Sequence, residues 1–172
     1  MKGLVIFMIC IFCYAADGFS THHCSIETSP DTSAIIKKIQ SDYSTINKQL
    51  KHYKKKIKDA PDMSAEGGEV TGYYDKNILK KIHAVFYGET GRAEVDYYLN
   101  NKKLFFVFRN DIFYDKPMYL KNSKVKNTVE TRYYLHGHQV IRCMVKPNTA
   151  TVLSYSEIGE VLKQILGILD SK

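Results

Sequence analysis

Histidine is the residue type best suited to acid–base chemistry near neutral pH, because its charge changes there. The chain has six, at His22, His23, His52, His83, His136 and His138. No serine or cysteine stands in the glycine-flanked elbow that presents a nucleophile. The sequence therefore predicts no catalytic residue, and a hydrolase whose site is assembled from separate strands is the enzymatic alternative.

Two histidine pairs have some of the character of a metal site. His136 and His138 lie two residues apart, but no third ligand stands beside them, so we expect ordinary turn residues. His22 and His23 are weak candidates, since cleavage after Ser20 would leave a free amine with histidine at the third position, a donor set for square-planar copper or nickel. We expect no cofactor and no metal beyond these weak candidates.

The cysteines divide into two groups. Cys10 and Cys13 lie in the apolar run at the N-terminus, whereas Cys24 and Cys143 would remain after its removal. In an oxidising compartment the latter two could form one disulfide. It would close a loop of more than about a hundred residues and contribute on the order of 4 to 5 kcal/mol in the chain-entropy view. Two unpaired thiols are the alternative.

Aromatic residues are the most unusual part of the composition, with 13 tyrosines, 8 phenylalanines and no tryptophan. The candidate ligand-binding residues are Tyr73, Tyr87, Tyr97, Tyr98, Tyr133 and Tyr134. They fall in expected strands, so some must lie side by side across a sheet. Such a set of rings either lines a core or lines a cleft for a sugar, lipid or peptide.

The strands that would position these rings are joined by short polar turns. They are expected at Val70–Tyr74, Leu79–Tyr87, Ala93–Leu99, Leu104–Tyr114, Val129–Leu135 and Gln139–Val145. Connections this short favour antiparallel neighbours. Residues 115–128 are expected to form a loop or an extended edge. In the strand at 104–114, residues 105–108 are apolar on both faces, as expected where a helix covers one side and loops or a ligand cover the other.

One helix is expected before these strands in the sequence and another after them. The first should run from Pro30 to about Lys58, with an apolar seam at Ile36, Ile39, Tyr43, Ile46, Leu50, Tyr53 and Ile57. This seam suits packing on the sheet, and a coiled-coil dimer is the alternative. The second should run from about Ser156, as its cap, to Leu169. The sequence therefore predicts an α+β fold with a long N-terminal helix, an antiparallel sheet of about six strands and a short C-terminal helix.

The outer face of the long helix is rich in lysine, and the chain has a net charge of +7. The lysines are Lys37, Lys38, Lys48, Lys51, Lys54, Lys55, Lys56 and Lys58. This pattern is typical of a solvated face, and contact with an anionic surface is the functional alternative. Nucleic acid is not expected as a partner of an exported protein.

Residues 1–20 have the layout of a secretory signal peptide. Lys2 precedes an apolar run from Leu4 to Ala15, and small residues follow it. The run is shorter than the roughly 20 residues that a membrane-spanning helix needs, and no later segment could span a bilayer. We therefore expect a secreted or periplasmic protein with a single domain at residues 21–172.

The pieces GGEVTGYYD, YGETG with the tyrosine-rich strand after it, and RYYL with QVIRC resemble a family of uncharacterised exported bacterial proteins. Those proteins have an N-terminal helix and an antiparallel meander. The resemblance covers residues 36–144 and implies export and an α+β fold. It implies no activity, because these motifs are strand and turn sequences.

These observations favour an exported, non-enzymatic protein that binds a ligand or protein partner through an aromatic sheet face. Two alternatives remain open. One is the hydrolase with a site assembled from separate strands. The other is a structural or adhesion protein of the cell envelope that uses the lysine-rich helix.

Overall fold

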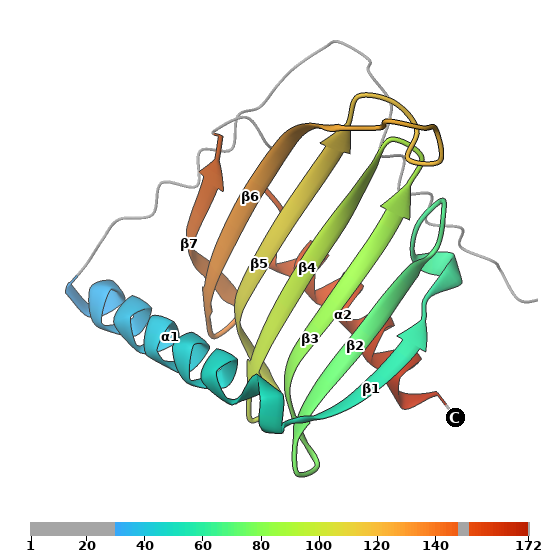
Figure 1. Cartoon of the computed structure of the whole chain (residues 1–172). Helices are drawn as coiled ribbons and strands as arrows, with labels where there is room; N and C mark the ends of the chain where they lie inside the picture. The colour runs from blue at the N-terminus through green and yellow to red at the C-terminus, as the bar shows by residue number, and fades with distance from the viewer. Residues whose placement is uncertain (1–29, 148–151, 172) are drawn as a thin grey trace, which may run out of the picture.

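The computed structural model describes residues 30–147 and 152–171, and it shows one antiparallel sheet with a helix on each face (Figure 1). The helices are α1 (Pro30–Gln49) and α2 (Tyr155–Asp170), with the short 3-10 helices η1 (Leu50–His52) and η2 (Pro61–Met63). The strands are β1 (Lys54–Asp59), β2 (Gly68–Asp75), β3 (Ile78–Gly88), β4 (Gly91–Asn100), β5 (Lys103–Tyr114), β6 (Val125–His136) and β7 (Gln139–Lys146). Each strand pairs with its neighbour in sequence. The predicted α+β fold is confirmed, with seven strands rather than about six.

The N-terminal helix ends earlier than the sequence predicts. The prediction that it continues to about Lys58 is wrong, because α1 ends at Gln49 and residues 54–59 form the edge strand β1. In a continued helix, lysines at positions 51, 54, 55 and 58 would lie three or four residues apart and repel one another. A strand places successive side chains on opposite faces. Pairing with β2, from Lys54 opposite Tyr74 to Asp59 opposite Glu69, therefore replaces the last helical turns.

The apolar seam of α1 packs on the sheet, as the first of the two alternatives predicts. Its isoleucines share a cluster with rings from β4, β5 and β6. The buried members are Ile36, Ile39, Ile46, Tyr53, Tyr98, Phe106 and Tyr134. Ile57, the last residue of the predicted seam, lies on β1 and is exposed. The lysines of the predicted helix are accordingly divided between α1, η1 and β1.

The second helix covers the other face of the sheet. Ile158, Ile165 and Leu169 of α2 are buried in one cluster with side chains such as Val70, Ile82, Tyr97 and Val107. The N-cap is Ser154 and not Ser156 as predicted. The Ser154 hydroxyl accepts the N–H of Glu157, and the Glu157 carboxylate accepts the N–H of Ser154. This reciprocal capping box fixes the start of the helix.

The edge strand β1 contacts the last turn of α2. The Lys56 ammonium of β1 donates a hydrogen bond to the carbonyl oxygen of Leu169 in α2. Neither helix in the described ranges has the length and apolar character needed to cross a membrane. The predicted signal peptide at residues 1–20, His22, His23 and Cys24 all lie outside the described residues.

Candidate ligand site on the open sheet face

Among the residues that the structure describes, α1 covers only one end of the sheet face on which it packs. Figure 1 shows α1 crossing the end at which β5 begins, and no other helix of the described residues lies over the rest of this face. One cross-strand row lies just beyond the helix and contains one residue from each of five strands. Its members are His83, Asp96, Phe108, Arg132 and Met144. We call the area that starts at this row the open face.

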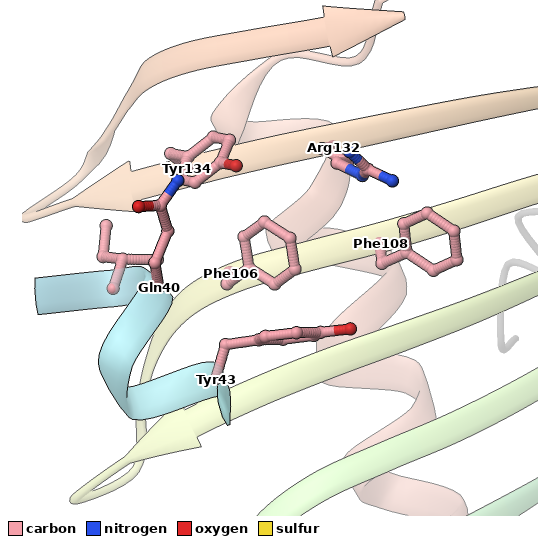
Figure 2. A pocket seen from close by; sticks show the side chains of 7 residues that line it. Gln40, Tyr43, Phe106, Phe108, Arg132 and Tyr134 are labelled. Carbon is pink, nitrogen blue, oxygen red and sulfur yellow. The ribbon is translucent and has the colours of Figure 1, made fainter. Parts of the chain in front are cut away.

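A groove of about 390 Å³ lies between α1 and the open face (Figure 2). It is lined by Ile39, Gln40, Tyr43, Phe106, Phe108, Arg132 and Tyr134. The rings pack edge to face, with the Phe106 centroid 5.2 Å from that of Tyr43 and 5.1 Å from that of Tyr134. The volume falls within the range of about 300 to 1,000 Å³ that is usual for small-molecule pockets. The groove can therefore hold a small apolar ligand on a preformed aromatic surface.

The positive charge in the groove comes from Arg132. Its guanidinium carbon lies 5.6 Å from the centroid of the Phe108 ring, which is cation–π geometry. One nitrogen contacts the Glu130 carboxylate at 3.2 Å, and the Arg132 side chain is 45% exposed. Ion pairs of this exposure contribute only about 0 to 1 kcal/mol. Because a guanidinium has five N–H donors, Arg132 can bind an anionic ligand group while it stays stacked on Phe108.

A second cluster of charges borders the groove on β3 and β4. Asp96 lies directly across from Phe108, on the neighbouring strand. Its two carboxylate oxygens receive Lys81 Nζ and His83 Nδ1, each at 2.8 Å. The Lys81 ammonium also lies 5.0 Å from the centroid of the Tyr98 ring. This cluster joins the aromatic cluster beneath α1 to the polar part of the open face.

The protonation of Asp96 reflects these contacts. Burial alone would raise the pKa of the Asp96 carboxyl, but the hydrogen bonds and positive charges of His83 and Lys81 outweigh it and lower this pKa below its ordinary value. Burial and the nearby Asp96 charge raise the pKa of the Tyr98 hydroxyl. Asp96 is therefore charged and Tyr98 neutral at physiological pH.

No family model, curated protein or solved structure matches this chain. The resemblance to exported bacterial proteins consequently stays a prediction.

The structure divides the six predicted ligand-binding tyrosines between the two faces. Tyr134 lines the groove, and Tyr98 is buried beneath α1. Tyr73 and Tyr87 are half-buried on the same face, where they lie opposite Lys81 and Arg92.

The other two, Tyr97 and Tyr133, are buried in the core against α2. The Leu153 N–H donates to the Tyr133 hydroxyl, and burial raises the pKa of Tyr133 to about 12. Adjacent residues in a strand point to opposite faces, so the pairs 97/98 and 133/134 cannot form one surface.

Several groove residues were not predicted as site residues. Phe106, Phe108 and Arg132 share a face with Tyr134, and Gln40 and Tyr43 come from the helix. The spacing of two between Phe106 and Phe108, and between Arg132 and Tyr134, places each pair on one face and could have indicated them. Which helix residues lie against which strand residues depends on how α1 docks on the sheet. No local sequence pattern predicts that docking.

The remaining candidates lie away from this groove. Cys143 is half-buried opposite Tyr133 on the α2 face, and its pairing with Cys24 stays a prediction because Cys24 is not described. His136 and His138 are exposed at the β6–β7 turn, where His138 Nδ1 lies 3.3 Å from the Tyr155 hydroxyl. The described part of the chain contains no cluster of three or more His, Cys, Asp or Glu side chains that could hold a metal ion.

Proposed function

We propose that this chain is an exported, non-enzymatic binding protein whose ligand occupies the groove between α1 and the open face. The observation that carries the proposal is an aromatic floor beside an accessible cation. Phe106, Phe108 and Tyr134 line the groove, and the Arg132 guanidinium lies over the Phe108 ring. Export rests on the signal-like pattern of residues 1–20.

The chemistry of the groove favours an amphipathic ligand with one negative charge. A flat or elongated apolar body would lie against the rings of Tyr43, Phe106 and Tyr134. A carboxylate or another anionic group would accept hydrogen bonds from Arg132 in place of the weak pair with Glu130. The Gln40 amide adds one further donor and acceptor at the helix side.

A fluorescence titration with anilinonaphthalene sulfonate, a flat apolar anion, tests this proposal. We expect saturable binding to the wild type and roughly tenfold weaker binding to Arg132→Gln, since a charge-assisted contact is lost. Arg92→Gln is the matched control, because Arg92 also pairs with a glutamate two residues away, Glu94, at 2.8 Å, yet does not line the groove.

This dye also binds partly unfolded proteins, so both variants must unfold in urea as cooperatively as the wild type. Two results would contradict the proposal. One is a wild type that does not bind the dye saturably. The other is an equal loss of affinity in Arg132→Gln and Arg92→Gln.

One contact favours an enzymatic alternative, a hydrolase with His83 as general base. The 2.8 Å contact between His83 Nδ1 and Asp96 Oδ1 is the arrangement that orients a catalytic imidazole. Within the described residues the His83 side chain hydrogen-bonds Asp96 alone. His83 would therefore activate a water molecule rather than a side-chain nucleophile.

Hydrolysis of nitrophenyl acetate by the wild type and by His83→Gln separates the two functions. The hydrolase alternative requires turnover above the buffer rate that is lost in the variant. We expect the two proteins to give the same background rate. A rate that depends on His83 would replace the binding function with the enzymatic one.

A further inference from the structure

The loop between β5 and β6, residues 115–124, exposes an unusual run of large apolar side chains. Tyr119 is 77% exposed, Leu120 46% and Met118 38%. Val125, the first residue of β6, is also exposed. Figure 1 shows this loop at the end of the sheet away from α1, so the groove does not involve it.

Hydrogen bonds hold the loop in a defined shape. Asp115 and Lys124 close its base, with Asp115 N–H donating to the Lys124 carbonyl at 3.0 Å and Lys124 N–H donating to Asp115 Oδ1 at 2.9 Å. The Met118 N–H donates to the Glu89 carbonyl of the β3–β4 turn at 3.1 Å. The apolar side chains are therefore presented by a fixed frame rather than left exposed by a lack of structure.

Positive charge surrounds the apolar tip. Four lysines lie in or next to the loop, namely Lys116, Lys121, Lys124 and Lys126, and all but Lys116 are exposed. The acid within the loop is Asp115, which already caps the Lys124 N–H.

Acidic groups on neighbouring elements also face the loop. The Tyr119 hydroxyl donates to Glu89 at 3.2 Å, and Glu66 lies close enough to act on Tyr119 electrostatically. The Glu89 contact ties down the polar end of Tyr119, but the ring itself stays in solvent. Basic residues therefore predominate at the tip and along the start of β6.

We propose that this loop docks the protein on an anionic lipid surface. Tyr119 and Leu120 would enter the boundary between headgroups and acyl chains, where aromatic and aliphatic side chains are favoured. The lysines would contact lipid phosphates, and each that reaches the surface adds roughly fivefold in affinity.

The shape of the loop favours a membrane over a protein partner. A stable protein interface buries upwards of about 1,000 Å² with complementary shape, which a tip of three apolar side chains cannot supply. A bilayer requires no matching surface. The same features exclude the tip as the core of a stable dimer.

The absence of tryptophan from the chain allows a local test in the full-length protein. Leu120→Trp places a single reporter at the tip. Ile78→Trp places one at a site of matched exposure, 47% against 46%, at the opposite end of the sheet. Vesicles contain equal parts of phosphatidylglycerol and phosphatidylcholine.

We expect the emission of Leu120→Trp to shift to shorter wavelength on vesicle addition and to be quenched by brominated lipid, with neither effect for Ile78→Trp. Vesicles of phosphatidylcholine alone should give a much smaller shift. Attachment through the apolar residues near the N-terminus would leave both reporters in water. The absence of a shift at position 120, equal shifts at both positions, or equal shifts with both lipids would overturn the proposal.

Cosedimentation gives a second, independent measurement. Joint replacement of Met118, Tyr119 and Leu120 by serine should weaken binding to the anionic vesicles by at least about tenfold, since their apolar burial is lost. Ile78→Ser should leave binding unchanged. If the triple variant instead alters self-association in size-exclusion chromatography and keeps its vesicle binding, the loop contacts a second copy of the chain and the proposal is wrong.

Discussion

Replacement of Asp96 by asparagine tests whether the charge cluster beside the groove stabilises the fold. Asp96 binds Lys81 and His83 through separate carboxylate oxygens. The Lys81 side chain is only 9% exposed, so Asp96→Asn would leave a nearly buried ammonium without its carboxylate. An amide oxygen can still accept one hydrogen bond, but it cannot balance the charge.

The expected loss follows from this burial. Removal of one partner from a fully buried ion pair costs about 3 to 5 kcal/mol. Because the Asp96 side chain retains 18% exposure, water compensates part of that loss. We therefore expect Asp96→Asn to lower the free energy of unfolding by about 2 to 3 kcal/mol at neutral pH.

The loss of unfolding free energy in Asp96→Asn should become smaller as the pH falls. The pKa of Asp96 is lower in the folded protein than the ordinary value of 3.8, so the folded state binds its proton less tightly than the unfolded chain. The stabilisation is then fully present above the unfolded pKa and disappears as the pH falls through the lower folded pKa. The gap in stability between wild type and Asp96→Asn should narrow over that acidic range.

Urea unfolding at neutral pH and at successive steps below pH 4 measures both effects. Glu94→Gln is the control, since Glu94 lies two residues away on β4 and pairs with Arg92 at 2.8 Å, with both side chains about one third exposed. Glu94→Gln should lower the free energy of unfolding by less than about 1 kcal/mol. The reasoning is refuted if Asp96→Asn is no less stable than Glu94→Gln, or if its deficit is the same at every pH.

The remaining predictions concern two glycines. A Cβ at Gly68 would lie 2.5 Å from the Val85 carbonyl oxygen on the neighbouring strand, so Gly68→Ala should lower the free energy of unfolding by about 2 kcal/mol or more. A Cβ at Gly159 in α2 meets nothing within 4 Å, so Gly159→Ala should raise that free energy by up to about 1 kcal/mol through higher helix propensity. Urea unfolding measures both, and a wild-type midpoint for Gly68→Ala or a lowered midpoint for Gly159→Ala would contradict the respective expectation.

Local patterns predicted much of the sheet. The turn residues and alternation around Val95 and Tyr97 locate β3, β4 and β5 to within a few residues, because each hairpin is closed by residues near in sequence. The apolar seam of α1 can be predicted for the same reason, because the spacing of its apolar residues lies within one segment. These elements can be predicted without information about distant segments of the chain.

The missed features depend on contacts between distant segments. The apolar period of α1 continues through Tyr53 and Ile57, so it does not mark the end of the helix. Pairing of residues 54–59 with the distant strand β2 stabilises a strand there instead. The groove requires Tyr43 to meet Phe106 and Arg132 to stack on Phe108, which depends on where α1 docks. The predicted site places all six tyrosines on one surface, although alternation along a strand separates Tyr97 from Tyr98 and Tyr133 from Tyr134.

The order of the sheet has a consequence for incomplete chains. The cluster beneath α1 uses residues from Ile36 to Tyr134, so it can form before α2 has been synthesised. The opposite face depends on the 16 residues of α2 to cover Val70, Ile82 and Tyr97. A chain truncated before α2 would thus carry all seven strands and one finished core while it displays the other to solvent. Such a product has the exposed apolar surface that chaperones recognise, so the second core depends on α2.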